Sequence, residues 1–221
     1  MADRSAIEAL IGDPCESLSV ELKRWIDPAS PAGIEKIAKG AIALRNRNGG
    51  YLVIGFDDKT CEPDTENEPP NAKTLFHIDV IQGIISKYSS DPFEVEVVWG
   101  ARDGRDYPVI VIPSGVKVPV AAKRDLLGLG SRTGIKNGAV YVRTLSSNGT
   151  ASTAQASPSD WSHLVNICFD NKEADITRFL LRFLPRHLPP DVAKAARYIV
   201  IAAYRMIVRY RAELKRKKPR H

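Results

Sequence analysis

The sequence is poor in the residues that build disulfide scaffolds and zinc sites. Its 221 residues include only three cysteines, Cys15, Cys61 and Cys168. Their number is odd, their spacing is wide, and they match no zinc-binding pattern. The four histidines also lack the spacing of metal ligands. We therefore expect reduced thiols and a cytoplasmic protein.

Long apolar runs and known nucleotide-binding loops are also missing. No run approaches the roughly 20 apolar residues of a membrane-spanning helix, and the N-terminus lacks the basic and apolar regions of a signal peptide. No Gly-Lys-Ser/Thr follows Gly49-Gly50, and Gly128-Leu-Gly130 lacks the strand and helix of a dinucleotide fold. We expect no membrane partner and no nucleotide hydrolase built on a phosphate loop.

The charge of the chain is unevenly distributed. The net charge is +6, from 32 Lys and Arg against 26 Asp and Glu. Residues 205–221 hold eight basic residues and one acidic residue, so the rest of the chain is close to neutral. The basic character therefore belongs to the C-terminal tail and does not extend to the whole body. The tail is either a solvated helix end or a contact for phosphates or a partner.

Hydrophobic periodicity predicts an α+β domain followed by helices. We expect a mixed, mostly antiparallel sheet with packed helices over 1–160, and a helical extension with a basic tail over 161–221. Residues 146–157, rich in Ser, Thr, Asn and Ala, are predicted to be a mobile loop. Prolines at 185, 189 and 190 are expected to interrupt the C-terminal helices. The expected strands are 18–23, 51–56, 93–99, 107–113 and 139–143, and the expected helices lie around 34–42, 75–88, 158–184 and 191–214.

Acidic residues of two separate segments are the first candidates for chemistry. Glu21 and Lys23 share one face of their strand, and Asp57 and Asp58 follow the strand 51–56. If these strands are neighbours, the acids converge, with Glu16 arriving from the preceding connection. Carboxylates so placed repel unless a cation lies between them, and Mg²⁺ or Mn²⁺ suits such hard oxygen ligands and activates water at a phosphate. The alternative is solvated carboxylates and an exposed Glu–Lys pair.

Basic residues form two further candidate groups. Arg45 and Arg47 precede Gly49-Gly50, a pattern that helix capping explains by itself, although the two arginines could also reach phosphates. The second group lies in a glycine-containing stretch and predicts either a phosphate-tracking groove or ordinary surface charge. Its members are Lys117, Lys123, Arg124, Arg132, Lys136 and Arg143.

Five segments in order resemble one known family. They are Glu16-Ser-Leu-Ser-Val-Glu21-Leu-Lys23, the helix end Ala41-Ile-Ala-Leu-Arg-Asn-Arg-Asn-Gly-Gly50, Tyr51-Leu-Val-Ile-Gly-Phe-Asp-Asp58, Val109-Ile-Val-Ile-Pro113, and Tyr141-Val-Arg143. Together they are similar to the Schlafen-type AlbA-like domain. The sequence departs from the family pattern at Leu22, where phenylalanine is usual, at Lys59, where a glycine is usual, and at Leu145.

The resemblance implies an activity. Some Schlafen-type domains are metal-dependent endoribonucleases that cut structured RNA such as tRNA, using two glutamates and an aspartate. By this resemblance Glu16, Glu21 and Asp58 hold Mg or Mn, with Asp57 as the alternative third ligand. Lys23 corresponds to the lysine beside the second glutamate and would stabilise charge at the phosphate. A role in host defence follows from the same likeness.

Three hypotheses follow from the sequence. The first is an endoribonuclease in which Lys117, Lys123, Arg124, Arg132 and Arg143 hold the RNA backbone. The second is a catalytically silent module that binds DNA or RNA. The third is an interaction protein, a homodimer or a partner-binding regulator, that assembles through residues 161–221.

Overall fold

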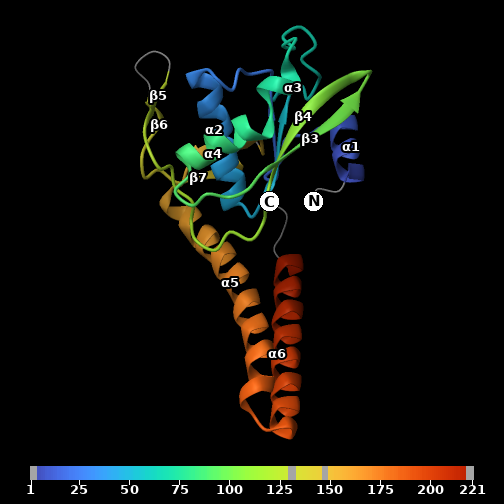
Figure 1. Ribbon diagram of the computed structural model, residues 1–221, viewed down its shortest axis with the longest axis vertical. Helices are drawn as coiled ribbons and strands as arrows, with labels where there is room; N and C mark the ends of the chain where they lie inside the picture. The colour runs from blue at the N-terminus through green and yellow to red at the C-terminus, as the bar shows by residue number, and fades with distance from the viewer. Residues whose placement is uncertain (1–3, 129–132, 146–148, 218–221) are drawn as a thin grey trace. The chain divides into compact units, whose positions relative to one another are not determined.

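The chain forms two compact units, Met1–Cys168 and Phe169–His221. The computed structural model describes residues 4–128, 133–145 and 149–217 (Figure 1). The expected α+β class is confirmed for the first unit, and helices make up the described part of the second. The elements are α1 Arg4–Gly12, β1 Val20–Lys23, α2 Pro31–Asn46, β2 Gly50–Ile54, α3 Ala72–Leu75, α4 Ile78–Tyr88, β3 Glu96–Arg102, β4 Arg105–Ile112, β5 Leu126–Leu127, β6 Thr133–Ile135, β7 Tyr141–Leu145, β8 Ala151–Gln155, α5 Pro158–His187 and α6 Pro190–Lys217.

A four-stranded sheet forms the centre of the first unit. Its strand order is β1-β2-β4-β3, and only the β1–β2 pair is parallel. The segments 18–23 and 51–56 are therefore neighbours, with Glu21 level with Leu52. The continuous apolar composition of β2 matches this interior place in the sheet.

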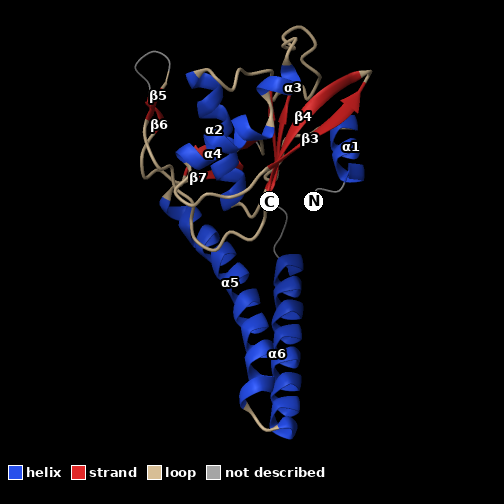
Figure 2. Cartoon of the chain, in the orientation of Figure 1, coloured by secondary structure: helices blue, strands red, loops and turns tan. Residues whose placement is uncertain are grey.

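Helices cover both faces of this sheet (Figure 2). On one face α2 and α4 bury a large core that includes Leu52, Ile54 and Ile110. On the other face α1 packs on β3 and shares a smaller core with Leu22 and Val53. Side chains alternate between faces along a strand, so Glu21 and Lys23 lie on the α2 side while Leu22 lies on the α1 side.

Helix α2 has well-defined ends. Ser30 caps its N-terminus by accepting a hydrogen bond from the Gly33 N–H (3.0 Å), and Pro31 occupies the first turn. At the C-terminus Asn48 (φ 76°) and Gly49 (φ 96°) adopt the left-handed conformation, and the Gly49 N–H donates to the Leu44 carbonyl. The capping interpretation of Gly49-Gly50 is therefore confirmed.

The segment 146–157 differs from its predicted loop. Residues Ala151–Gln155 form β8, which pairs antiparallel with β7, so the loop prediction is wrong over these five residues. The strand carries no apolar alternation because most of its side chains stay exposed, and the β7 backbone supplies its hydrogen bonds. Residues 146–148 lie outside the described part of the chain.

The C-terminal helices also differ in detail from the prediction. Helix α5 continues through Pro185 to His187, and the chain breaks its helical course only around Pro189. Within the described ranges, none of the helices has the length and apolarity needed to cross a bilayer.

Asn46 fastens the end of α2 to the neighbouring segments. Its side chain is buried, donates to the carbonyls of Val120 (2.8 Å) and Tyr141 (2.9 Å), and accepts from the Val120 N–H (2.8 Å). We expect Asn46→Ala to lower the free energy of unfolding by about 2–3 kcal/mol, because buried backbone groups lose their partners. Urea denaturation measures this loss. Asn67→Ala, at an exposed loop position, is the control, and equal stability of the two variants would contradict the prediction.

Candidate functional site

Glu21 is a buried carboxylate of the edge strand β1, on the α2 side of the sheet. It is 3% exposed. Its Oε1 lies 2.9 Å from the Lys23 ammonium, and its Oε2 accepts a hydrogen bond from the Thr153 hydroxyl (2.9 Å). The expected shared face of Glu21 and Lys23 is confirmed by this ion pair. A carboxylate taken out of water requires such partners to remain ionised.

Gly40 of α2 makes room for this carboxylate. A Cβ at position 40 would lie 2.9 Å from Glu21 Oε2, closer than van der Waals contact permits. A glycine in a helix interior ordinarily costs about 1 kcal/mol relative to alanine. Here the missing side chain allows α2 to pass directly over Glu21.

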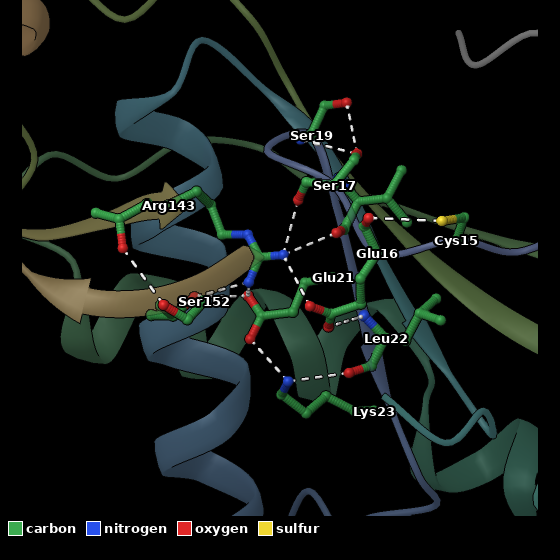
Figure 3. Close-up of polar contacts among 12 residues, drawn as sticks. Cys15, Glu16, Ser17, Ser19, Glu21, Leu22, Lys23, Arg143 and Ser152 are labelled. Carbon is green, nitrogen blue, oxygen red and sulfur yellow. Dashed lines mark hydrogen bonds and ion pairs between the residues drawn. The ribbon is translucent and has the colours of Figure 1, made fainter. Parts of the chain in front are cut away.

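Glu16 reaches the same place from the connection between α1 and β1, as expected from its offset. Its Oε1 accepts a hydrogen bond from the Leu22 N–H (3.0 Å), which fixes the side chain along the edge strand β1. Its Oε2 points to the guanidinium of Arg143 at 3.3 Å. Figure 3 shows both glutamates turned toward this arginine.

Arg143 supplies the cation between the two glutamates. Its side chain, from β7, is 1% exposed; Nη1 lies 3.5 Å from Glu21 Oε2 and Nη2 lies 3.3 Å from Glu16 Oε2. Nη2 also donates to the carbonyls of Ser17 (2.8 Å) and Val20 (2.9 Å). Arg143, which was expected to contact nucleic acid, is therefore buried among partners of its own chain.

Asp57 and Asp58 have different surroundings. Asp58 is exposed, opens on the same groove as Glu16 and Glu21, and makes no hydrogen bond or salt bridge with the described residues. The Asp57 carboxylate instead accepts the N–H groups of Lys59 (2.9 Å) and Thr60 (2.8 Å) and pairs with Arg24. The Asp57 carboxylate is therefore held in its own turn, and Asp57 is not a lining residue of the groove.

The groove has a volume of about 290 Å³ and is lined by α2, the β1 region and the β7–β8 hairpin. Lys36 and Lys39 of α2 were not predicted from the sequence. Their signal was weak: a spacing of three on the polar side of a helix is ordinary surface composition. Thr153 was missed because its segment showed no strand pattern. The lining residues are Glu16, Glu21, Lys23, Glu35, Lys36, Lys39, Asp58, Arg143, Ala151, Ser152 and Thr153.

Charges in the groove are largely paired within the chain. Lys39 binds Glu35 at 2.7 Å, and Lys23 and Arg143 neutralise Glu21 and Glu16. Lys36 and Asp58 are the charged lining residues that make no hydrogen bond or salt bridge with the described part of the chain. A bound phosphate or cation would therefore meet these two groups without breaking an ion pair.

The predicted basic residues lie elsewhere. Arg45 donates to the carbonyls of Pro113 (2.8 Å) and Ser114 (2.6 Å), and burial lowers its pKa. Burial also lowers the pKa of Arg47, which lies beside Asp160. Arg45 thus joins the end of α2 to the segment after β4, and Arg47 is half-buried near Asp160. Lys117, Lys123 and Arg124 are exposed and are not lining residues of the groove, and Arg132 lies outside the described residues.

The carboxylate oxygens of the groove are suitable ligands for a hard divalent cation. In this structure, however, Glu16 and Glu21 are bridged by Arg143. Carboxylate oxygens are the ligands that Mg²⁺ and Mn²⁺ prefer. Among the described residues, no three acidic, histidine or cysteine side chains are disposed around one point as metal ligands. The reason is that Arg143 and Lys23 already take oxygens of Glu16 and Glu21.

Comparison with known proteins decides the family. A family model described as Schlafen, AlbA_2 matches residues 16–152. The chain belongs to this family. The match spans every element of the groove up to Ser152, and the resemblance drawn from the five motifs is confirmed. The Schlafen AlbA_2 match does not include α5 and α6. A search of curated proteins gives no match.

Two solved structures are also similar to this chain. The DIP2311 protein from Corynebacterium diphtheriae has 16% sequence identity and a TM-score of 0.45, with 71% of this chain and 31% of that chain covered. The N-terminal domain of a RecG-related protein from Nitrosomonas europaea has 20% identity and a TM-score of 0.35, with 62% of this chain and 89% of that domain covered. This chain thus spans less than a third of the DIP2311 chain.

The Asp57 turn makes stability depend on pH. Hydrogen bonds from Thr60, Arg24 and Lys59 hold the pKa of Asp57 well below its usual range. The stabilisation is therefore present above the unfolded pKa of about 3.9 and is lost as the pH falls toward the folded pKa. We expect Asp57→Asn to lower the melting temperature at about pH 7, and the gap to wild type to narrow at about pH 3. A gap that is constant with pH would refute this linkage.

Proposed function

We propose that this Schlafen AlbA_2 domain is a divalent-metal-dependent endoribonuclease that acts on tRNA or another structured RNA. The observation that carries the proposal is the convergence of Glu16, Glu21 and Asp58, from three separate segments, on one open groove. The two glutamates reach it from the β1 region, and the aspartate follows β2. This is the set of acids that the family's nucleases use.

Glu16, Glu21 and Asp58 would hold an Mg or Mn ion once oxygens of the two glutamates were released from Arg143 and Lys23, with which they pair in this structure. The ion would supply polarisation of the scissile phosphate and activation of water. The chain's own residues supply the remaining charge: Lys23 neutralises negative charge near Glu21, and Lys36 offers an exposed ammonium to a phosphate oxygen. Helix α2 forms one wall of the groove. It contributes both Lys36 and the space that the missing side chain of Gly40 leaves for Glu21.

RNA binding in this proposal relies on charge outside the groove as well. Lys117, Lys123 and Arg124 are exposed, and the sequence of residues 205–221 is strongly basic. Contacts of this kind weaken as salt rises, since binding releases counterions from the nucleic acid. DNA would satisfy the same charges, so the phosphate backbone alone does not select RNA.

A second candidate function is a catalytically silent module that binds DNA or RNA. The observation that favours it is the Glu16–Arg143–Glu21 bridge, in which the protein's own guanidinium already neutralises both glutamates. Such a bridge stabilises the fold of the β7–β8 hairpin against β1 with no metal. The two candidates differ in whether acidic side chains of the groove take part in cutting.

Cleavage of labelled tRNA in the presence of Mn²⁺ separates these functions. We expect Glu21→Gln and Asp58→Asn each to reduce the cleavage rate more than about 100-fold, since losing a group that only orients a metal ligand already costs about 10–100-fold. Glu66→Gln, an exposed carboxylate of the loop after Asp58, is the control and keeps its activity. Melting temperatures show whether each variant is folded. Retained RNA binding with no metal-dependent cutting by the wild type would support the silent module instead.

Gly40 gives an independent test of the same site. We expect Gly40→Ala to reduce cleavage about tenfold or more, because the new methyl group displaces the Glu21 carboxylate from its position. The melting temperature shows whether the variant is folded, and the higher helix propensity of alanine offsets part of the cost of moving the buried carboxylate. The matched control is Gly83→Ala in α4, where the added methyl group meets open space. Wild-type cleavage by Gly40→Ala would place the reaction away from Glu21.

A further inference from the structure

The helical unit carries an exposed apolar row along α5. Phe169, Ile176 and Phe183 follow one another at intervals of seven residues and are 62%, 57% and 43% exposed. Phe179 adds a fourth large side chain, 61% exposed, which stacks on Phe183 with ring centroids 5.5 Å apart. Residues seven apart lie on one side of a helix, and an interval of three keeps Phe179 close to that side.

The spacing of this row is that of a helix that packs against another helix. Positions 169, 176 and 183 correspond to one core position of a heptad, and 172 and 179 correspond to the other. Lys172 is the one polar residue among these five, and its aliphatic stem can cover apolar surface. Contiguous apolar surface of this kind is uncommon on a face that stays in water. The row therefore predicts a helical occupant.

The charges beside the row are arranged with opposite signs about Ile176. On the N-terminal side Asp170, Glu173 and Asp175 outweigh Lys172, and on the C-terminal side Arg178 and Arg182 carry only positive charge. A second copy of α5 running in the opposite direction would place the acidic half of each helix beside the basic half of the other. A parallel copy would place like charges together. The surface is thus complementary to itself under a two-fold axis.

Helix α6 carries a comparable row with different charges. Val192, Ile199 and Met206 are also seven residues apart and are 46%, 69% and 71% exposed. The charged residues among and beside them are Asp191, Lys194, Arg197 and Arg205, of which three are basic. Two copies of α6 would bring like charges together. Of the two rows, that of α5 is therefore the one suited to a second copy.

We propose that the protein is a dimer in which α5 packs antiparallel against α5 of a second copy, with Ile176 near the two-fold axis. Asp175 and Arg182 are seven residues apart and flank the row on the same side. In the antiparallel pair this side faces its equivalent. Asp175 of each copy, which pairs with Arg178 of its own helix at 2.8 Å, then also approaches Arg182 of the other copy. The apolar side chains supply affinity, and the charges select the antiparallel direction.

The mass of the full chain in solution, measured by sedimentation equilibrium, tests the dimer. The wild type is expected at twice the chain mass of 24.4 kDa. Ile176→Asp is expected at the mass of one chain, because it buries an unpaired charge at the axis. Ile199→Asp, the matched control in the α6 row, is expected to remain dimeric. A monomeric wild type would overturn the proposal and would be the result if the α5 row binds a different protein. A dimer that persists in the Ile176→Asp variant would also overturn it.

Exchanging the charges of Asp175 and Arg182 tests the antiparallel direction. Because the combined variant is expected to dimerise again, a loss caused by misfolding can be distinguished from a loss of charge pairing. Asp175→Arg and Arg182→Asp, made separately, each place like charges opposite one another and are expected to weaken the dimer at least about tenfold. The variant that combines both changes restores opposite charges and is expected to recover the wild-type dissociation constant. Single variants that bind as tightly as the wild type, or a combined variant that stays weak, would exclude this pairing.

Discussion

A buried glutamate and a partly buried one beside a single arginine are the constraint on which the first unit depends. Glu16 and Glu21 approach the same place from a loop and a strand, and their repulsion must be offset where little water enters. Arg143 meets that requirement from β7, more than 120 residues later in the chain. The bridge thereby joins the β7–β8 hairpin, which is a separate two-stranded sheet, to the edge strand β1 of the main sheet.

This arrangement joins folding to the proposed chemistry. The guanidinium that stabilises the hairpin also occupies oxygens that a divalent ion would use, so any ion must compete with it. The open side of the groove is different: Asp58 and Lys36 make no ion pair with the described residues. The groove therefore combines a rigid, self-neutralised wall with two charged groups exposed to solvent, and family membership indicates which chemistry such acids perform elsewhere.

The apolar row of α5 shows a separate principle in the helical unit. A long amphipathic helix is stabilised mainly by burial of its apolar side, yet four large side chains of α5 remain exposed within one chain. An antiparallel copy would cover them and match the charges beside them. The family match ends at residue 152, so this surface lies in a part of the chain outside the matched domain.

The sequence alone determined the α+β class, the shared face of Glu21 and Lys23, and the capping role of Gly49, because each follows from local periodicity and backbone chemistry. The tertiary structure decided that β1 and β2 are neighbours. Only the tertiary structure decided between Asp57 and Asp58, since Arg24 and the following turn hold one carboxylate and leave the other in the groove. It also reassigned Arg143 from the surface to the interior. The long-range partners of charged side chains cannot be read from the periodicity of the sequence. The same holds for a strand such as β8, which is paired through its backbone.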